Sequence, residues 1–301
     1  MARTRVIYAT DMLYVGPTGY NSATGNHFVT PTAWGTYTGN GNRVAELYRV
    51  QRIDNNWAKN LTDVNQFGEL ASIDRIGLEP PTVGLTFSYL LSNFINEDLM
   101  GLHVAKAGDA SQVSCLSGIL ASVTDQKNYF VKTVAEGQDA ADYSSATYDV
   151  VSFGNGYIGS YTAQGAVGSF PTADITVAAL NAQMQQVTHA AGARIPAINQ
   201  ADGTAITGWG YQLPTGLTSY GNAGLTDNQG ISVLRPGDIT LNLGVNAGDG
   251  FAQESDIKIQ NFNVSFNTNQ EDLNKLGSKF AYAKVPRFPV SATLTASALL
   301  G

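Results

Sequence analysis

Apolar and polar residues alternate over several short segments of the chain, most regularly near its C-terminal end. There the apolar positions are Ile257, Ile259, Phe262, Val264 and Phe266. A period of two residues predicts a β-strand with one buried face. The three-residue step from Ile259 to Phe262 interrupts this period, and it predicts a β-bulge between these two residues.

The same alternation predicts further strands, and turn residues separate them. These strands are expected at 81–87, 129–134, 148–153, 157–167, 170–177 and 289–295. Two long stretches, 16–42 and 199–230, are rich in Gly, Asn, Thr and Ser and show no clear period. We predict both as extended loops. The pattern as a whole predicts a mainly β fold.

An internal repeat relates two distant parts of the chain. When the sequence is shifted by 209 positions, residues 50–91 lie over residues 259–300 without a gap, and 11 of the 42 aligned pairs are identical. The ungapped length and a shared D-x-N-x-x-G register favour duplication over chance. We predict a first β domain at 1–101, a connector at 102–128, and a second β domain at 129–301 that carries the loop 199–230. The repeated turn or helix positions are Asp63, Asn65, Gly68, Asp272, Asn274 and Gly277.

Each repeat unit also carries apolar residues at helical spacing after its first strand. Asp63 and Asp272 precede or begin this spacing, where a helix dipole favours acidic side chains. We therefore predict a short amphipathic helix in each unit, which Gly68 and Gly277 would end or kink. The apolar residues at this spacing are Val64, Phe67, Leu70, Ala71, Leu273, Leu276 and Phe280.

Composition supports the β prediction and excludes some kinds of partner. Only 14% of the 301 residues are charged, against roughly 25% in an average domain. The formal net charge is −7, so a direct grip on nucleic acid, which needs clustered Lys and Arg, is not expected. The sequence contains no stretch of 18 apolar residues, so no membrane span is predicted. Thr10 and Asp11 interrupt the N-terminal apolar run, so no signal peptide is predicted and folding in a reducing cytoplasm is expected.

The chain shows no local signature of catalysis. Residues 154–159 match G-x-G-x-x-G, but strand-like sequence follows them instead of a helix, so we predict a β-turn and not a dinucleotide site. His27, His103 and His189 lack metal-ligand spacing, and the single Cys115 excludes an intrachain disulfide. No G-x-S-x-G motif is present. We expect no enzyme activity, no cofactor and no metal.

Several segments resemble the major tail proteins (tail tube proteins) of tailed bacteriophages. The resemblance covers about half of the chain in patches. The matching patches are Leu234-Arg235-Pro236-Gly237-Asp238-Ile239-Thr240-Leu241, the segments 257–262, 276–283 and 288–290, the segments 64–68 and 78–83, and Val167-Gly168-Ser169-Phe170-Pro171-Thr172.

This resemblance implies tube-type domains, each an antiparallel β-sandwich or part-barrel with a flanking helix. In the family, such domains close into rings that stack into a tube for genome passage. A duplicated domain is compatible with three chains per ring in pseudo-sixfold symmetry, and six chains are the other arrangement. The implied partners are further copies, other tail proteins, and double-stranded DNA that passes without specific binding. The implied location is the virion tail, after synthesis in the host cytoplasm.

Candidate contacts between subunits follow from this implication. We expect ring-to-ring contacts at the loops 16–42 and 202–230. For strand pairing between neighbouring subunits, the candidates are Ile53, Trp57, Phe262, Val264 and Phe266.

Two other functions stay open at this point. One is a different phage structural protein, such as a capsid decoration protein or a head–tail connector component. The other is a β-sandwich carbohydrate-binding module, in which Trp34, Trp57 and Trp209 could stack on sugars.

Overall fold

A computed structural model gives the fold of the chain. It describes residues 11–17, 44–92, 94–104, 114–120, 126–134, 140, 147–188, 193–196, 198, 210–211, 213, 233–239 and 257–300. Most residues of the two predicted loops, 16–42 and 199–230, lie outside the described ranges. Trp34 and Trp209 lie outside them as well.

The described chain is mainly β, as its alternating pattern predicts. The strands are β1 (Met12–Pro17), β2 (Ala45–Glu46), β3 (Val50–Ala58), β4 (Thr62–Val64), β5 (Asp74–Ile76), β6 (Thr82–Leu90), β7 (Lys127–Thr133), β8 (Thr147–Ala166), β9 (Thr172–Ala179), β10 (Asn181–Thr188), β11 (Ala193–Arg194), β12 (Gly210–Tyr211), β13 (Ile257–Asn267), β14 (Gln270–Leu273), β15 (Ala283–Pro286) and β16 (Ala292–Leu300). The helices are α1 (Ile95–Met100), α2 (Ser117–Leu120) and the 3-10 turn η3 (Pro236–Asp238).

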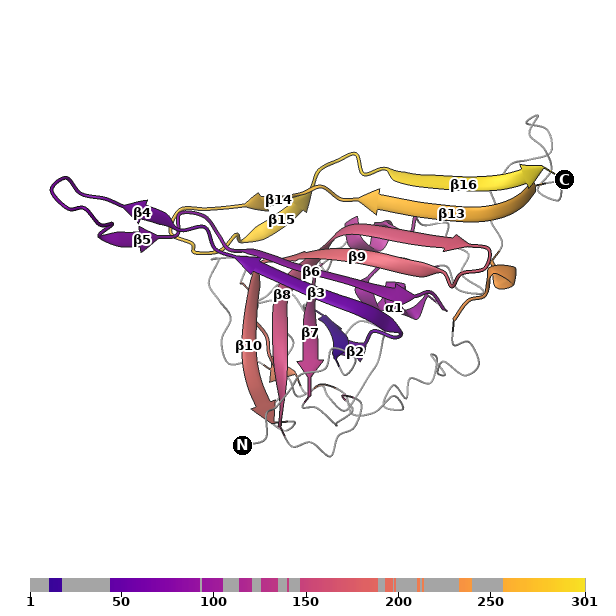
Figure 1. Ribbon diagram of the computed structural model, residues 1–301, viewed down its shortest axis with the longest axis horizontal. Coiled ribbons are helices and arrows are strands. Elements are labelled where there is room, and N and C mark those ends of the chain that lie inside the picture. The colour runs from indigo at the N-terminus through magenta and orange to yellow at the C-terminus, as the bar shows by residue number, and fades with distance from the viewer. Residues whose placement is uncertain are drawn as a thin grey trace, which may run out of the picture.

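One long strand, β8, connects two antiparallel layers. Its first half pairs with β7 and β10, and its second half pairs with β9 and β13. The first layer has the order β2-β1-β7-β8-β10, and the second has the order β3-β6-β9-β8-β13-β16. Figure 1 shows that β7 and β10 run steeply across the direction of β6 and β9. This is the orthogonal type of sheet packing, in which one strand passes from sheet to sheet at a corner.

The main core fills the angle between these two layers. Phe87 on β6 and Tyr129 on β7 are both buried, and their ring centroids lie 6.1 Å apart. Leu13 of β1 and Met100 of α1 belong to the same apolar cluster. The alternating apolar residues of the second layer therefore face the first layer and α1, which leaves the opposite face of the second layer to solvent.

The G-x-G-x-x-G segment lies inside β8, so the predicted β-turn at 154–159 is wrong. The strand changes layer here, and its ladder is irregular opposite β7 and opposite β9. Asn155 has a φ of 51° and is buried. Its Nδ2 donates to Oε1 of Gln126 at 2.6 Å, and its Oδ1 accepts from the backbone N–H of Ile198 at 2.6 Å. A bulged strand with satisfied polar groups replaces the turn.

The repeated segments fold into the same nested hairpin. β3 pairs with β6 around β4 and β5, and β13 pairs with β16 around β14 and β15. The registers are equivalent at an offset of 209, since Val50 faces Tyr89 and Ile259 faces Ala298. The predicted bulge after Ile259 is confirmed, and β3 has a bulge at the matching place.

The short helices predicted within the repeats are wrong. A small hairpin, β4–β5 or β14–β15, occupies each place and projects beyond the ends of β3 and β13 (Figure 1). Phe67, Leu70 and Leu276 are fully exposed. Their helical spacing therefore does not form a buried stripe, and without a surface to cover, a segment this short gains nothing from a helix. The helices α1 and α2 lie elsewhere in the sequence.

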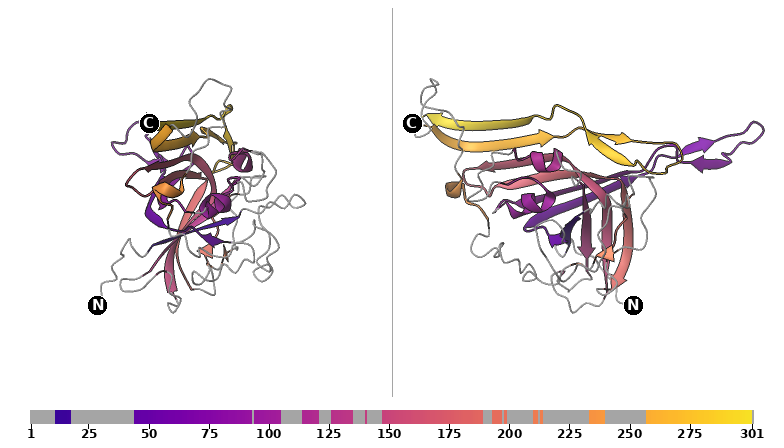
Figure 2. Two further views of the ribbon diagram at one scale, coloured as in Figure 1. Left: turned by 90° about the vertical axis from the view of Figure 1, so that its right-hand side faces the viewer. Right: turned by 180° about the vertical axis from the view of Figure 1, so that it is seen from behind.

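Both nested hairpins belong to one layer. β6, from the predicted first domain, pairs with β9, from the predicted second domain, and β13 pairs with β8. Figure 2 shows the layer from behind, with the two hairpins side by side with β8 and β9. The division of the chain at 101 and 129 stays a sequence prediction.

Candidate assembly surface

The six-stranded layer β3-β6-β9-β8-β13-β16 ends in two open edges. Among the described strands, β3 pairs only with β6, and β16 pairs only with β13. The outer N–H and C=O groups of β3 and β16 therefore have no strand beside them within the described part of the chain. Such edges tend to pair with another chain, and natural proteins usually block or cover them.

The structure places the predicted pairing residues on two different kinds of strand. Ile53 and Trp57 lie on the open strand β3. Phe262, Val264 and Phe266 lie on β13, which has β8 on one side and β16 on the other. From Asn261 to Phe266 the backbone of β13 is thus paired on both sides within the chain, and β16 takes its place at the edge.

One face of this layer is polar from edge to edge. A single row across it shows the pattern: Arg52–Ser88–Asp174–Thr162–Ser265–Thr293. The hydroxyl and amide side chains of this face are Asn56, Thr82, Thr86, Ser88, Ser160, Thr162, Gln164, Thr172, Thr176, Asn261, Asn263, Ser265, Asn267, Thr293, Thr295 and Ser297.

Few charges interrupt this polar face. Arg52 Nε contacts Asp54 Oδ2 on the same strand at 2.5 Å, and Asp174 lies near the middle of the face. At one end of the face, Lys258 of β13 lies opposite Leu299 of β16. Sequence reasoning missed this surface, although its signal is present in the repeated Thr, Ser and Asn residues at alternate strand positions. Nearly all of the face can hydrogen-bond with water. Its cations on the described strands are Arg52, which pairs with Asp54, and Lys258, so phosphate groups would find few partners there.

The opposite face is apolar and is covered only in its middle. The row beside the polar row is Ile53–Phe87–Ile175–Tyr161–Phe266–Ala292. Phe87 and Ile175 are buried, and the rings of Tyr161 and Phe266 stack at 5.5 Å. Towards the edges the cover ends, because Trp57 on β3 and Leu294 on β16 are each 44% exposed. Both edge strands thus carry apolar side chains that the chain itself leaves partly open to water.

A buried carboxyl group ties α1 to this layer. The hydroxyls of Tyr89 and Tyr161 donate to Oε1 of Glu97 at 2.7 and 3.0 Å. Burial raises the pKa of Glu97, although the two tyrosine hydrogen bonds oppose the shift. Burial also raises the pKa of both tyrosines, so their hydroxyls keep their protons and remain donors. Asn96 of the same helix holds the backbone of Tyr48 with two hydrogen bonds of 2.8 Å.

The two projecting hairpins have equivalent frames. We call them arm one (residues 59–81) and arm two (residues 268–291). An ion pair joins the strands of each arm, between Asp63 and Arg75 at 2.5 Å in arm one and between Asp272 and Lys284 in arm two. The other repeated positions, Asn65, Gly68, Asn274 and Gly277, lie in or beside the turns at the tips.

The arms differ in what they cover. In arm two, Ala281 is buried with Tyr157, Leu180 and Ile198, and Phe280 packs against this cluster. Arm one has no such contact in the described part of the chain. Its exposed apolar side chains are Leu61, Phe67, Leu70, Ile73, Ile76 and Leu78.

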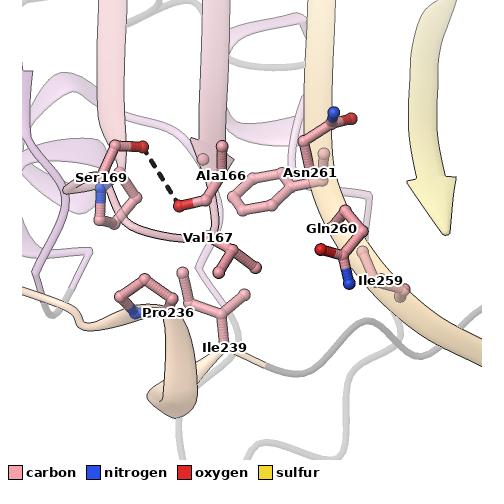
Figure 3. A pocket seen from close by; sticks show the side chains of 11 residues that line it. Ala166, Val167, Ser169, Pro236, Ile239, Ile259, Gln260 and Asn261 are labelled. Atoms are coloured by element: carbon pink, nitrogen blue, oxygen red, sulfur yellow. Dashed lines mark hydrogen bonds between the residues drawn. The ribbon is translucent and has the colours of Figure 1, made fainter. Parts of the chain in front are cut away.

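Figure 3 shows a partly open pocket. The start of β13 and the end of β8 line it, so it lies at the opposite end of the layer from the arms. The β8–β9 turn, η3 and the bulged start of β13 enclose it, with Val167, Ile239 and Ile259 in its lining. Ser169 Oγ donates to the Ala166 carbonyl at 3.1 Å, and Val167 N–H donates to the Gln260 carbonyl at 3.0 Å. These bonds fix the turn, so the pocket has a rigid and mostly apolar wall.

Neither membrane-spanning helices nor metal-binding clusters occur among the residues that the structure describes. No helix there is long and apolar enough to cross a bilayer. No group of three His, Cys, Asp or Glu side chains lies close enough together there to hold a metal ion.

Comparisons with known proteins show a likeness in structure and none in sequence. No protein-family model and no curated protein matches the sequence. Among solved structures, the chain is similar to a chain in the cryo-EM structure of an extracellular contractile injection system, the PVC sheath–tube complex in its extended state. The identity is 8%, the match covers 62% of this chain and 95% of that chain, and the TM-score is 0.36. A likeness at this level carries no functional argument, so we infer function from the chain's own surfaces.

Proposed function

We propose that this chain is a structural subunit of a phage tail tube, which polymerises into stacked rings around a channel for the genome. The observation that carries this proposal is the six-stranded layer with two open edges and one polar face. We propose no catalytic role, and the protein's place would be the virion tail beside other tail proteins.

The strand directions allow copies to join edge to edge. β3, β9 and β13 run one way, and β6, β8 and β16 run the other way. The edge strand β16 of one copy can therefore pair antiparallel with β3 of the next copy and keep the alternation. The two edges are different surfaces, so the contact is head-to-tail and produces a ring where the rotation closes. Closure removes the open edges from every copy.

The same arrangement decides which face would line the channel. The first layer and α1 cover the apolar face, so they occupy one side of the six-stranded layer. The polar face is the side without this cover, and a ring built from these layers would place it towards the lumen. A wall of hydroxyl and amide groups with few cations would let DNA slide, because tight binding to phosphates requires Lys and Arg.

Ring size follows from the number of strands. With six strands per chain, strand spacing of roughly 4.8 Å and a tilt of about 40° give a backbone diameter of roughly 36 Å for three chains or roughly 72 Å for six. Side chains of roughly 5 Å on each wall leave lumens of roughly 26 or 62 Å. Measured ring diameter therefore separates the two stoichiometries.

Negative-stain microscopy and mass photometry of the purified chain test this proposal. We expect rings of one diameter that stack into tubes as the concentration rises. A chain that stays monomeric over a wide concentration range would overturn the proposal. Copies that bind capsids or cap tail ends without polymerising would favour a decoration or connector protein instead.

A further inference from the structure

We propose that arm one of each subunit docks its tip, Phe67 and Leu70, into the apolar pocket at the β8–β9 turn of a subunit in the next ring. This inference rests on the proposed tube function and names the axial contact that the proposal requires. It differs from the loops 16–42 and 202–230, at which the sequence predicts ring-to-ring contacts.

The tip of arm one leaves two large apolar side chains uncovered by its own chain. Phe67 and Leu70 are 106% and 110% exposed, at the end of a hairpin that projects beyond the sheet (Figure 1). An ion pair between Asp63 and Arg75 and a backbone hydrogen bond of 2.9 Å from Ile73 N–H to the Val64 carbonyl keep the arm ordered. Apolar side chains held away from the core in this way are typical of an interaction site.

Arm two packs against its own chain through side chains that arm one lacks. The two arms are equivalent at an offset of 209, so Phe67 matches Leu276 and Leu70 matches Lys279. Arm two already packs on its own chain through Phe280 and Ala281, whereas the matching positions in arm one are Ala71 and Ser72. Both tips thus expose one matching apolar side chain, Phe67 or Leu276, but arm one adds Leu70 where arm two has Lys279 and lacks the side chains that pack arm two on its own chain.

The pocket has the complementary character. Its lining includes Pro171, Pro236, Ile239 and Phe262, and the turn beside it exposes 64% of Val167. The turn also carries Phe170, which is 62% exposed. Figure 3 shows the side chains of Val167, Pro236 and Ile239 close together in the lining. Burial of Phe67 and Leu70 there would remove apolar surface from water on both partners.

Geometry places the tip and the pocket in different copies. β3 and β13 run towards the arms, while the pocket lies at the start of β13. β13 has 11 residues, so at roughly 3.3 Å per residue it spans about 36 Å between these two ends. A tip cannot reach its own pocket across this length. A copy shifted along the strand direction brings its pocket to the tip, and the contact repeats without limit because it is head-to-tail.

Two variants with opposite defects test the contact. Phe67→Ser/Leu70→Ser removes the tip, and Val167→Glu places a charge at the pocket mouth. Both sites are exposed, so each variant should keep its fold and form single rings, and the concentration needed for stacking should rise at least about tenfold. Met184→Ser removes an apolar side chain that is 64% exposed on β10, and this matched control should still form long tubes.

Mixing the two kinds of ring gives the decisive result. Rings without tips keep their pockets, and rings with blocked pockets keep their tips, so a mixture should form ring pairs that grow no further. Ring pairs support the contact. Long tubes from either variant alone, or a mixture that stays as single rings, would overturn the contact and leave the tube function standing. Absence of rings in the wild type would overturn the tube function, and this contact with it.

Discussion

Gly68 and Gly277 occupy the same place in two hairpin arms that are 209 residues apart in the chain. Both have positive φ, at 97° and 85°, and each lies at the turn that joins the strands of its arm. The backbone bond of 2.9 Å from Ile73 N–H to the Val64 carbonyl has its counterpart in the bond of 3.0 Å from Tyr282 N–H to Leu273. The repeat thus preserves turn conformation and hydrogen bonding as well as sequence.

Alanine at either glycine should loosen its arm. An added Cβ meets no atom within 4 Å at Gly68 or Gly277, so the cost comes from the left-handed backbone alone, at about 1–2 kcal/mol. We expect Gly68→Ala to lower hydrogen-exchange protection of the Ile73 amide by about five- to thirtyfold, and Gly277→Ala to do the same at Tyr282. Gly237→Ala is the control, since its Cβ also has open space but its φ is not positive. Unchanged protection in both arms would contradict the equivalence.

Much of the strand layout could be predicted from the alternating pattern. The bulge after Ile259 follows from one extra residue between apolar positions, and the equivalent registers follow from the repeat. The arms could not be predicted from spacing, because Phe67 and Leu276 look like a helical stripe until it is known that nothing covers them. The change of layer at Asn155 depends on partners from distant segments, Gln126 and Ile198.

The open edge could not be assigned from the sequence either. β3 and β13 occupy equivalent places in the repeat, but β3 lies at an edge and β13 lies between two strands. This difference comes from the order in which hairpins join the layer, which is a long-range property. The polar face, by contrast, is visible in the sequence as Thr, Ser and Asn at alternate positions, but this alternation does not show that the strands concerned share one sheet.

Glu97 should make stability fall as the pH rises. Its pKa is raised in the folded chain from the ordinary value of 4.5, so its contribution is fully present below pH 4.5 and is lost as the pH rises through the folded pKa. Glu97→Gln keeps an acceptor for the Tyr89 hydroxyl and cannot ionise. We expect the variant to gain unfolding free energy relative to the wild type between pH 4.5 and 7.

Urea unfolding at several pH values measures this difference. Asp98→Asn is the matched control, because it removes the same charge from the same helix at a half-buried position. A Glu97→Gln difference that stays constant from pH 4.5 to 7 would contradict the assignment.

A cation on the polar face should turn the channel wall into a DNA-binding surface. Thr176 is exposed in the middle of this face, opposite Thr86. We expect wild-type rings to leave short DNA duplexes unbound at 0.1 M salt and Thr176→Lys rings to bind them. A plot of the logarithm of the binding constant against the logarithm of the salt concentration should have a slope of about −0.9 for each phosphate neutralised. Met184→Lys adds the same charge on β10, and equal binding by that control would show that the face is not special.

Proline scanning of β16 should separate folding from assembly. In an antiparallel edge strand, successive N–H groups point alternately to the partner strand and outwards. Thr295→Pro and Ala296→Pro occupy consecutive positions, so one of them removes a bond to β13 and the other removes an outward donor. Urea unfolding identifies the outward position as the less destabilised variant.

The outward variant should stay folded and lose the ability to form rings in mass photometry. Normal rings from that variant would mean that the outer side of β16 takes no part in assembly.

The most direct test of the account is a cryo-EM reconstruction of the assembled rings at a resolution that separates strands. We predict that β16 of each copy lies antiparallel to β3 of its neighbour at roughly 4.8 Å, with Thr176 and Asn263 facing the lumen. Rings in which both edge strands face solvent, or in which the polar face lies on the outer wall, would contradict it.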